Sequence, residues 1–545
     1  MRTRQLMSTM VPLLWCLLRV SYAISLDLND ENSVNSAAQT IAKGVMSYYD
    51  GYKYGGTVGM MVNPYYWWEA GSAFNGIFMY GVITGDHQYD QVLYDSIMHQ
   101  SGDNWDFVVQ NQTNVEGNDD IGFWAIFVLE CLERGFQEPP GQNGWLSLVE
   151  NAFNGMVSRW DPSSCGGGLR WQIYDWNAGY DYKNSISNGC FFNIAARLAH
   201  YTGNQTYVDW ANQIYDWMVD VGFMNLPTPA MSYKIYDGAS ISGGCSNPSL
   251  PEWSYTYGVF LSGMAYLYDF EGQSELWAQR ADLAVNRAKA IYFAANGNIM
   301  WEPSCMVVNN CNNDQRSFRA PFSRFLGHLM IYMPQYRDTF MPLLQKNAYA
   351  AAQSCSGGSD GVTCGMNWAQ SGWDGVWGLG EQMSALEVIL NTQILNFGSP
   401  ASSPGASGYS GSSSNSGGES SSSSSSSSSA DATSSSSSPT SSPADTSSSD
   451  STTSSDSSSS SDSSSSTDSS SSAVASSPVV TTTNSSSSSD METSANSSTT
   501  AVTSIAATAS ATTTNSTKSH NGSNEPVGAH GWLFAVAFGL ALQLV

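Results

Sequence analysis

The chain has 545 residues and a formal net charge of −26 at neutral pH, an acidic balance that argues against nucleic acid as a partner. Residues 399–521 are mostly Ser and Thr with scattered Asp, Ala, Pro and Asn. Such a segment offers too little apolar surface to offset the entropy lost on folding, so we predict that it is a disordered, O-glycosylated stalk. The composition therefore confines the folded part to residues 24–398, a size compatible with one large domain.

The N-terminus has the pattern of a secretory signal peptide. Arg2 and Arg4 precede an apolar core, Leu13–Leu18, and Ser21-Tyr22-Ala23 places small residues at both positions that a signal peptidase reads. We predict that residues 1–23 are removed.

The C-terminus has the pattern of a second processing signal. Residues 531–545 form an apolar tail too short to span a membrane comfortably, preceded by a polar spacer and by the small triplet Asn521-Gly522-Ser523. This order is typical of a glycosylphosphatidylinositol (GPI) attachment signal, with Asn521 as the anchored residue and 522–545 as the removed propeptide; a tail-anchored helix is the alternative. We expect a secreted protein anchored at the outer face of the plasma membrane, in a cell wall, or both.

Cysteine usage agrees with secretion. Eight cysteines remain after Cys16 leaves with the signal, an even number typical of disulfides, and the short spacings favour local pairs Cys305–Cys311 and Cys355–Cys364. Neither a Cys-x-x-Cys motif nor a His cluster indicates a metal site, and we expect no cofactor. Asn111 and Asn204 begin glycosylation sequons.

Two adjacent carboxylates, Asp119 and Asp120, follow Asn118 where a loop gives way to an apolar segment. Asn118 suits a helix N-cap, and the apolar residues that follow recur at helical spacing: Ile121, Trp124, Ala125, Val128, Leu129 and Leu132. Acidic residues in a first turn are favoured by the helix dipole, so capping is one interpretation. The other is catalysis, because two carboxylates about 5 Å apart suit a retaining glycosidase, and their repulsion separates the two titrations.

A unit of helix, glycine turn and helix recurs along residues 24–398. We expect helices over 33–49, 67–84, 89–99, 119–135, 145–158, 185–201, 205–221, 254–270, 275–293, 318–332, 335–353 and 381–396. One member of each early pair is rich in Gly, Ala and aromatics, and its partner is amphipathic; the first kind is typical of buried helices. The pattern predicts an all-α fold, an (α/α)6 toroid, with a simple solenoid as the alternative.

Aromatic residues gather before or at the start of the expected inner helices, where they would surround the mouth of a toroid. Flat rings stack on the apolar faces of pyranoses, so this collection favours a sugar site, although each ring could equally belong to the core. The candidates are Tyr65, Tyr66, Trp67, Trp68, Trp124, Trp171, Trp176, Trp253, Tyr255, Trp368, Trp373 and Trp377. Asn188 is either a structural amide or a ligand for sugar hydroxyls.

These residues resemble glycoside hydrolase family 76, the endo-1,6-α-mannanases, and especially its fungal cell-wall branch. The resemblance covers about residues 26–396 and rests on the segments 65–71, 118–120, 184–189 and 252–258. It implies a retaining mechanism in which Asp119 is the nucleophile and Asp120 the general acid/base. It also implies α-1,6-mannan or a GPI glycan as substrate, with water or a wall β-glucan as acceptor.

Two rival interpretations remain open at this point. A non-catalytic mannan-binding or structural wall protein could use the same aromatic mouth, but it would not need both aspartates. A hydrolase for a different glycan could share the fold. Glu69, Asp181, Glu252 and Asp374 are further acidic candidates for a supporting role.

Overall fold

The computed structural model describes residues 23–141, 143–228 and 232–402, which belong to one compact unit. The rest of the predicted signal peptide, the stalk beyond residue 402 and Asn521 lie outside the described residues. In the described part, no helix is both long enough and apolar enough to cross a membrane.

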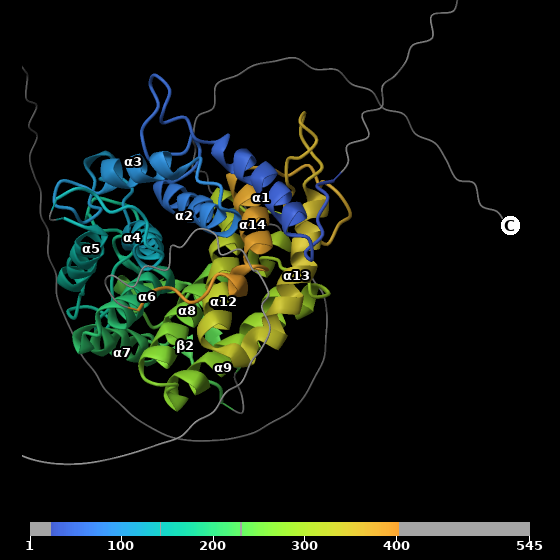
Figure 1. Cartoon of the computed structure of the whole chain (residues 1–545). Coiled ribbons are helices and arrows are strands. Elements are labelled where there is room, and N and C mark those ends of the chain that lie inside the picture. The colour runs from blue at the N-terminus through green and yellow to red at the C-terminus, as the bar shows by residue number, and fades with distance from the viewer. Residues whose placement is uncertain (1–22, 142, 229–231, 403–545) are drawn as a thin grey trace, which may run out of the picture. The chain divides into compact units, whose positions relative to one another are not determined.

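Six helices of the described chain form an inner ring (Figure 1). Each packs on the next, and the last returns to the first, which closes the ring. Nearly every residue of these helices is buried, as their apolar and small-residue composition requires. They are α2 (Trp67–Thr84), α4 (Asn118–Glu133), α6 (Ser185–Thr202), α8 (Ser254–Phe270), α12 (Arg319–Tyr332) and α14 (Leu379–Leu390).

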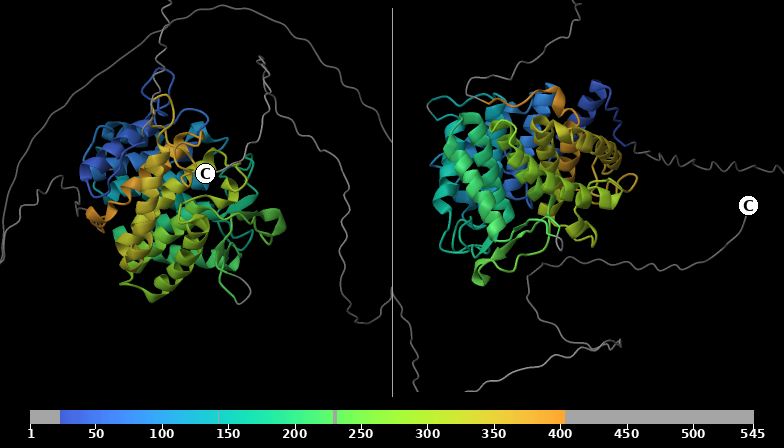
Figure 2. Two further views of the ribbon diagram at one scale, coloured as in Figure 1. Left: turned by 90° about the vertical axis from the view of Figure 1, so that its right-hand side faces the viewer. Right: turned by 90° about the horizontal axis from the view of Figure 1, so that it is seen from below.

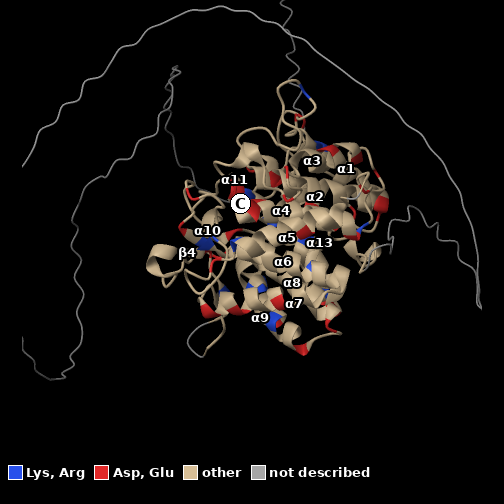
Figure 3. Cartoon of the chain, turned by 90° about the vertical axis from the view of Figure 1, so that its left-hand side faces the viewer, with Lys and Arg blue, Asp and Glu red and all other residues tan. Residues whose placement is uncertain are grey.

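Amphipathic helices cover the outside of this ring. They are α1 (Glu31–Met46), α3 (Asp90–Gln100), α5 (Trp145–Arg159), α7 (Gln205–Asp220), α9 (Glu275–Tyr292) and α13 (Arg337–Ser354). Figure 3 shows few charges on α6 and α8 but several of both signs on α9. The difference follows burial, because α6 and α8 are almost wholly buried and α9 has one face in solvent. The arrangement confirms the predicted (α/α)6 toroid, and the closure of the ring excludes an open solenoid.

Glycines end two of the inner helices where the sequence predicts turns. Gly85 after α2 and Gly203 after α6 both have φ of 72°, and their N–H groups donate to Gly81 and Ala199 respectively. Only glycine adopts this left-handed conformation without strain, so these positions send the chain back along the outside of the ring.

Short elements decorate the loops. Two antiparallel pairs of strands join β1 (Tyr182–Asn184) to β4 (Gly238–Ser240), with Lys183 opposite Ala239, and β2 (Met224–Asn225) to β3 (Lys234–Ile235). The short helices are α10 (Pro303–Met306) and α11 (Asn313–Ser317), with 3-10 turns η1 (Gln110–Gln112), η2 (Ile241–Gly243), η3 (Ala294–Asn296), η4 (Pro334–Tyr336) and η5 (Ile394–Asn396). Figure 2 shows such loops extending beyond the helix ends.

Three disulfides staple these loops. Cys305–Cys311 and Cys355–Cys364 are the local pairs expected from their spacing, and Cys165–Cys245 joins two loops that are distant in the sequence. The even number of cysteines is misleading for the remaining two, because Cys131 and Cys190 are unpaired thiols buried in inner helices.

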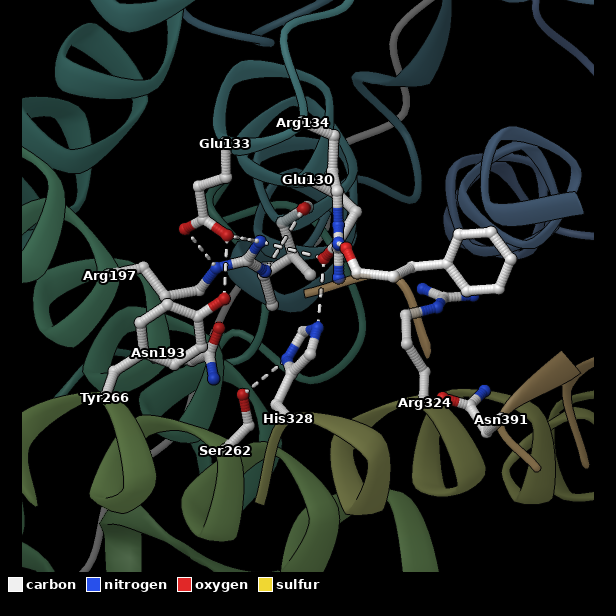
Figure 4. A network of polar contacts seen from close by, with 12 residues as sticks. Glu130, Glu133, Arg134, Asn193, Arg197, Ser262, Tyr266, Arg324, His328 and Asn391 are labelled. Atoms are coloured by element: carbon white, nitrogen blue, oxygen red, sulfur yellow. Dashed lines mark hydrogen bonds and ion pairs between the residues drawn. The ribbon is translucent and has the colours of Figure 1, made fainter. Parts of the chain in front are cut away.

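A buried charge network joins inner helices toward their C-terminal ends (Figure 4). Arg197 of α6 contacts Glu130 and Glu133 of α4, at 3.0 and 2.8 Å. The Tyr266 hydroxyl of α8 donates to Glu133, and His328 of α12 lies 3.0 Å from Glu130. This cluster, the Arg197 network, ties four helices of the ring together.

Candidate active site

The N-terminal ends of the inner helices meet around one cavity of about 560 Å³. Its walls take residues from the starts of α2, α4, α8 and α12 and from the loops between helices. The lining residues are Met60, Asn63, Tyr65, Tyr66, Trp67, Trp68, Gln112, Asn114, Val115, Asp119, Asp120, Phe123, Trp171, Gln172, Ala178, Tyr182, Asn184, Asp237, Tyr255, Asp314 and Phe318. A site of this size, with aromatic walls and a few carboxylates, suits a small stretch of glycan.

Asp119 and Asp120 lie in the first turn of α4 and line this cavity. The prediction that Asn118 is the N-cap of α4 is wrong. Gly117 is the N-cap, because it has extended backbone angles while Asn118 is already helical. The Asn118 side chain instead accepts from Arg159 and donates to the Arg170 carbonyl. Asp120 therefore occupies the third helical position, from which its Oδ2 accepts the Gly117 N–H at 2.7 Å.

The two carboxylates have different donors. Asp119 Oδ2 accepts from Asn184 Nδ2 at 3.2 Å, and its Oδ1 accepts from the Asp120 N–H at 3.1 Å. Asp120 accepts only from Gly117 among the hydrogen bonds found in the described structure. Because donors favour the ionised form, this geometry makes Asp119 the better carboxylate and Asp120 the better acid.

Burial shifts both titrations upward. Desolvation raises the pKa of Asp119 to about 7, and the Asn184 hydrogen bond limits that rise. Desolvation and then the negative charge of Asp119 raise the pKa of Asp120 well above its ordinary value. The pair therefore holds one proton over a wide range near neutrality, the state that divided acid and nucleophile roles require.

Two further carboxylates, which the sequence did not single out, also line the cavity. Asp237 accepts from Tyr182 at 2.7 Å and from Trp253 at 3.0 Å, and Asp314 accepts from Trp68 at 2.8 Å. Burial raises the pKa of both groups. They come from the turn between β3 and β4 and from α11, segments whose sequence gives no periodic signal that would place them at the mouth.

Six of the aromatics predicted to contact sugar stand on the cavity wall. They are Tyr65, Tyr66, Trp67, Trp68, Trp171 and Tyr255. Tyr255 stacks on Phe318, with ring centroids 3.7 Å apart and planes 8° apart, which fixes the orientation of both rings. Phe318, Phe123 and Tyr182 complete the aromatic surface and were not among the sequence candidates.

The other predicted ligands lie outside the cavity lining: Trp124, Trp176, Asn188, Trp253, Trp368, Trp373 and Trp377. Trp124 is fully buried and stacks beneath Trp67, to whose carbonyl it donates. Asn188 is buried and bonds the backbone of Leu169 and Asn184. Trp253 supports Asp237 from behind, and Trp373 packs on Gly357 beside Trp377. Trp124, Asn188 and Trp253 each bond a cavity-lining residue, Trp67, Asn184 and Asp237 respectively, and so support the lining from behind.

None of the four additional acidic candidates lines the cavity. Glu69 is buried and accepts from the Tyr66 N–H and the Ser317 hydroxyl, and Asp181 is exposed. Glu252 pairs with Arg287, and Asp374 accepts backbone N–H groups of its own loop. Glu69, Glu252 and Asp374 each have a structural partner, and Asp181 is exposed to solvent.

A ring of paired helices with a carboxylate pair in an aromatic cavity at its mouth defines a carbohydrate-cleaving enzyme of the (α/α)6 type. Residues 33–403 match the model of Glycosyl hydrolase family 76, and the chain belongs to this family. It is a glycoside hydrolase, as the resemblance predicts.

The chain is similar to fungal members of the family over its helical part. It is 51% identical to Mannan endo-1,6-alpha-mannosidase DFG5 of Candida albicans over 371 residues, which are 67% of this chain and 81% of that protein. It is 48% identical to Mannan endo-1,6-alpha-mannosidase DCW1 of Saccharomyces cerevisiae over 384 residues, 70% of this chain and 84% of that one.

Solved structures share the fold. The structure of Dfg5 from Chaetomium thermophilum in complex with glucosamine matches with a TM-score of 0.65 and 30% identity, covering 70% of this chain and 97% of that chain. The GH76A alpha-1,6-mannanase from Salegentibacter sp. HEL1_6 matches with a TM-score of 0.54 and 17% identity, covering 66% and 99% of the two chains.

Proposed function

We propose that this enzyme cleaves α-1,6-linked mannose in fungal cell-wall glycans with retention of configuration, Asp119 being the nucleophile and Asp120 the general acid/base. The observation that carries the assignment is the unequal support of the two carboxylates: Asn184 and a backbone N–H hold Asp119 ionised, and Asp119 keeps Asp120 protonated. The names of the fungal relatives support the substrate.

The reaction then has two steps. Asp120 gives its proton to the glycosidic oxygen while Asp119 attacks the anomeric carbon, which breaks the glycosidic bond and forms a glycosyl ester on Asp119. Asp120 next removes a proton from an acceptor hydroxyl, whose oxygen attacks the same carbon and releases Asp119 as a carboxylate. Water as the acceptor gives hydrolysis, and a sugar hydroxyl gives transglycosylation.

The charge of the cavity supports a neutral or cationic glycan. Four aspartates line it, and Lys, Arg and His are absent from its described lining. An anionic sugar would meet repulsion there, whereas the amino group of a glucosamine would meet attraction. The glucosamine complex of the Chaetomium relative agrees with this preference and supports a GPI glycan as one substrate. We propose transfer of such mannoproteins to wall β-glucan as the physiological outcome.

The ends of the chain support a matching location. Cleavage after Ala23 and lipid attachment at Asn521 would leave the catalytic head on a Ser/Thr-rich stalk at the outer face of the plasma membrane or in the wall. Glycans on Asn111 and Asn204, both exposed, are compatible with that route.

The test is product analysis by mass spectrometry with a defined α-1,6-mannooligosaccharide, with and without a glucan acceptor. We expect wild type to shorten the oligosaccharide, and Asp119→Asn and Asp120→Asn each to abolish turnover while remaining folded by circular dichroism. Asp181→Asn, which changes an exposed carboxylate outside the cavity, is the control and retains activity. A folded but inactive wild type that still binds the oligosaccharide would instead support a wall-binding protein.

A further inference from the structure

Two aromatic rings, half-buried Tyr174 and exposed Trp176, lie stacked on the loop that follows the cavity-lining residue Trp171. The ring centroids of Tyr174 and Trp176 are 4.6 Å apart and their planes differ by 21°. Trp176 is 63% exposed, although burying such a ring in the core would ordinarily be favourable. We name this pair the Tyr174–Trp176 ledge.

The ledge is held rigidly by its neighbours. The Trp176 indole N–H donates to the Thr113 carbonyl at 3.1 Å, and Asn177 Nδ2 donates to the same carbonyl and to Gln172. The one polar atom of the tryptophan side chain is therefore used within the protein. What remains toward solvent is ring surface whose orientation is already fixed, so a ligand that stacks there loses little entropy in ordering it.

The ledge continues the cavity wall. Trp171, Gln172 and Ala178, on either side of it in the sequence, line the cavity, as do Gln112 and Asn114 from the loop that receives the Trp176 hydrogen bond. The Ile173 N–H donates to the Glu116 carbonyl at 3.1 Å, and the Asn118 N–H donates to the Trp171 carbonyl at 2.8 Å. The loop is thus tied directly to the start of α4, which carries the aspartate pair.

We propose that the Tyr174–Trp176 ledge is an outer sugar subsite, which stacks on a pyranose of the same glycan chain whose reacting bond lies at Asp119 and Asp120. This inference rests on the proposed function. A mannan chain is longer than a cavity of about 560 Å³ can enclose, so it must leave across the rim, and the ledge offers the flat apolar surface that pyranose rings prefer. The subsite contacts long substrates and is out of reach of short ones.

The experiment compares the full-length wild type with Trp176→Ala, using α-1,6-mannotriose and a much longer α-1,6-mannooligosaccharide. We expect KM for the long substrate to rise about three- to tenfold, the range for loss of one aromatic stack, with kcat and the mannotriose parameters unchanged. Trp176→Phe, which keeps a ring but loses the N–H, should restore most of the affinity. Tyr349→Ala removes an exposed ring from outer helix α13 and should change KM and kcat for neither oligosaccharide.

Calorimetric binding of both oligosaccharides to Asp120→Asn, with and without Trp176→Ala, tests the ledge without turnover. If wild type showed no turnover but binding still depended on oligosaccharide length and on Trp176, the proposed chemistry would be refuted and the proposed subsite would be supported. Equal weakening of both substrates by Trp176→Ala, or of neither, would overturn the subsite. The subsite would also be overturned if the stronger binding of the long oligosaccharide appeared only in Asn111→Gln, because the N-glycan on Asn111 would then cover the ledge in the natural protein.

Discussion

Asn184 is the side chain that most directly distinguishes the two aspartates. It donates to Asp119 and, through its own Oδ1, caps α6 by accepting the Ser187 N–H at 3.1 Å. Asn184→Ser should keep the cap, since serine caps well, but its side chain is too short to reach Asp119. We expect kcat to fall about ten- to a hundredfold, the worth of a hydrogen bond to a charged group.

The pH profile separates this positioning role from a purely structural one. The Asn184 hydrogen bond lowers the pKa of Asp119, so its loss should raise that pKa and move the acidic limb of the rate profile to higher pH. Asp30→Ser, which exchanges the N-cap of α1, is the matched control and should shift neither limb. An unchanged profile in Asn184→Ser would remove Asn184 from the catalytic arrangement.

The aspartate pair should also cost the protein stability as pH rises. A folded-state pKa above the ordinary 3.8 means that the folded protein binds more protons than the unfolded chain, so stability falls as pH rises above about 4, through the Asp119 value of about 7. Asp120→Asn removes this repulsion. We expect its melting temperature to exceed that of wild type by on the order of 1–3 °C at pH 7 and to converge with it below pH 4. A melting difference that is the same at both pH values would contradict a charge origin.

Helix geometry explains which aromatic neighbour of the pair faces the cavity. Phe123 follows Asp119 by four residues and Asp120 by three, so it shares their face and lines the cavity. Trp124 is rotated away and lies in the core. Trp124 is the ring predicted from the sequence, although the spacing within α4 favours Phe123, which shares a face with both aspartates. Asp237 and Asp314 could not be predicted from the sequence pattern, because only tertiary packing brings their segments to the cavity.

At the scale of elements, glycines allow the inner helices to approach closely. A Cβ on Gly122 of α4 would lie 2.4 Å from the Cβ of Cys190 in α6, and one on Gly189 would lie 2.6 Å from Val259 of α8. The Gly- and Ala-rich composition that predicted buried helices therefore has a specific cause in the packing of the ring. The same composition, with the glycine turns, explains why the predicted helix bounds agree with the observed ones to within a few residues at most ends.

Substituting one of these glycines should be costly. Gly122→Ala forces a backbone-proximal carbon into Cys190, which cannot rotate away, and we expect a loss of about 1–3 kcal/mol in the free energy of unfolding, measured by urea denaturation. Gly81→Ala in α2 is the matched control, because its Cβ would meet neighbours only at 3.5 Å or more. There the higher helix propensity of alanine should stabilise by about 0.5–1 kcal/mol. Equal effects at the two positions would refute the close-packing argument.

Over the whole ring, the two ends of the inner helices differ in the residues that they carry. The N-terminal ends present the carboxylates, whose charge the helix dipole of α4 favours, and the helix starts and loops there carry the aromatic rings that line the cavity. Toward the C-terminal ends, the Arg197 network of α4, α6, α8 and α12 is fully buried (Figure 4). A buried network whose members satisfy one another favours one arrangement of the helices that it joins.

Arg197 is the residue on which that network depends. Arg197→Met keeps most of the volume but leaves Glu130 and Glu133 without the cation that contacts both. Breaking a buried pair by removing one partner costs about 3–5 kcal/mol, and we expect a loss of that size in the free energy of unfolding by guanidinium denaturation. Asp216→Asn breaks the pair with Arg280 from its solvent-exposed side and should lose about 1 kcal/mol or less. Losses of similar size in the two variants would mean that the glutamates are neutralised without Arg197, and that packing alone keeps the inner ring closed.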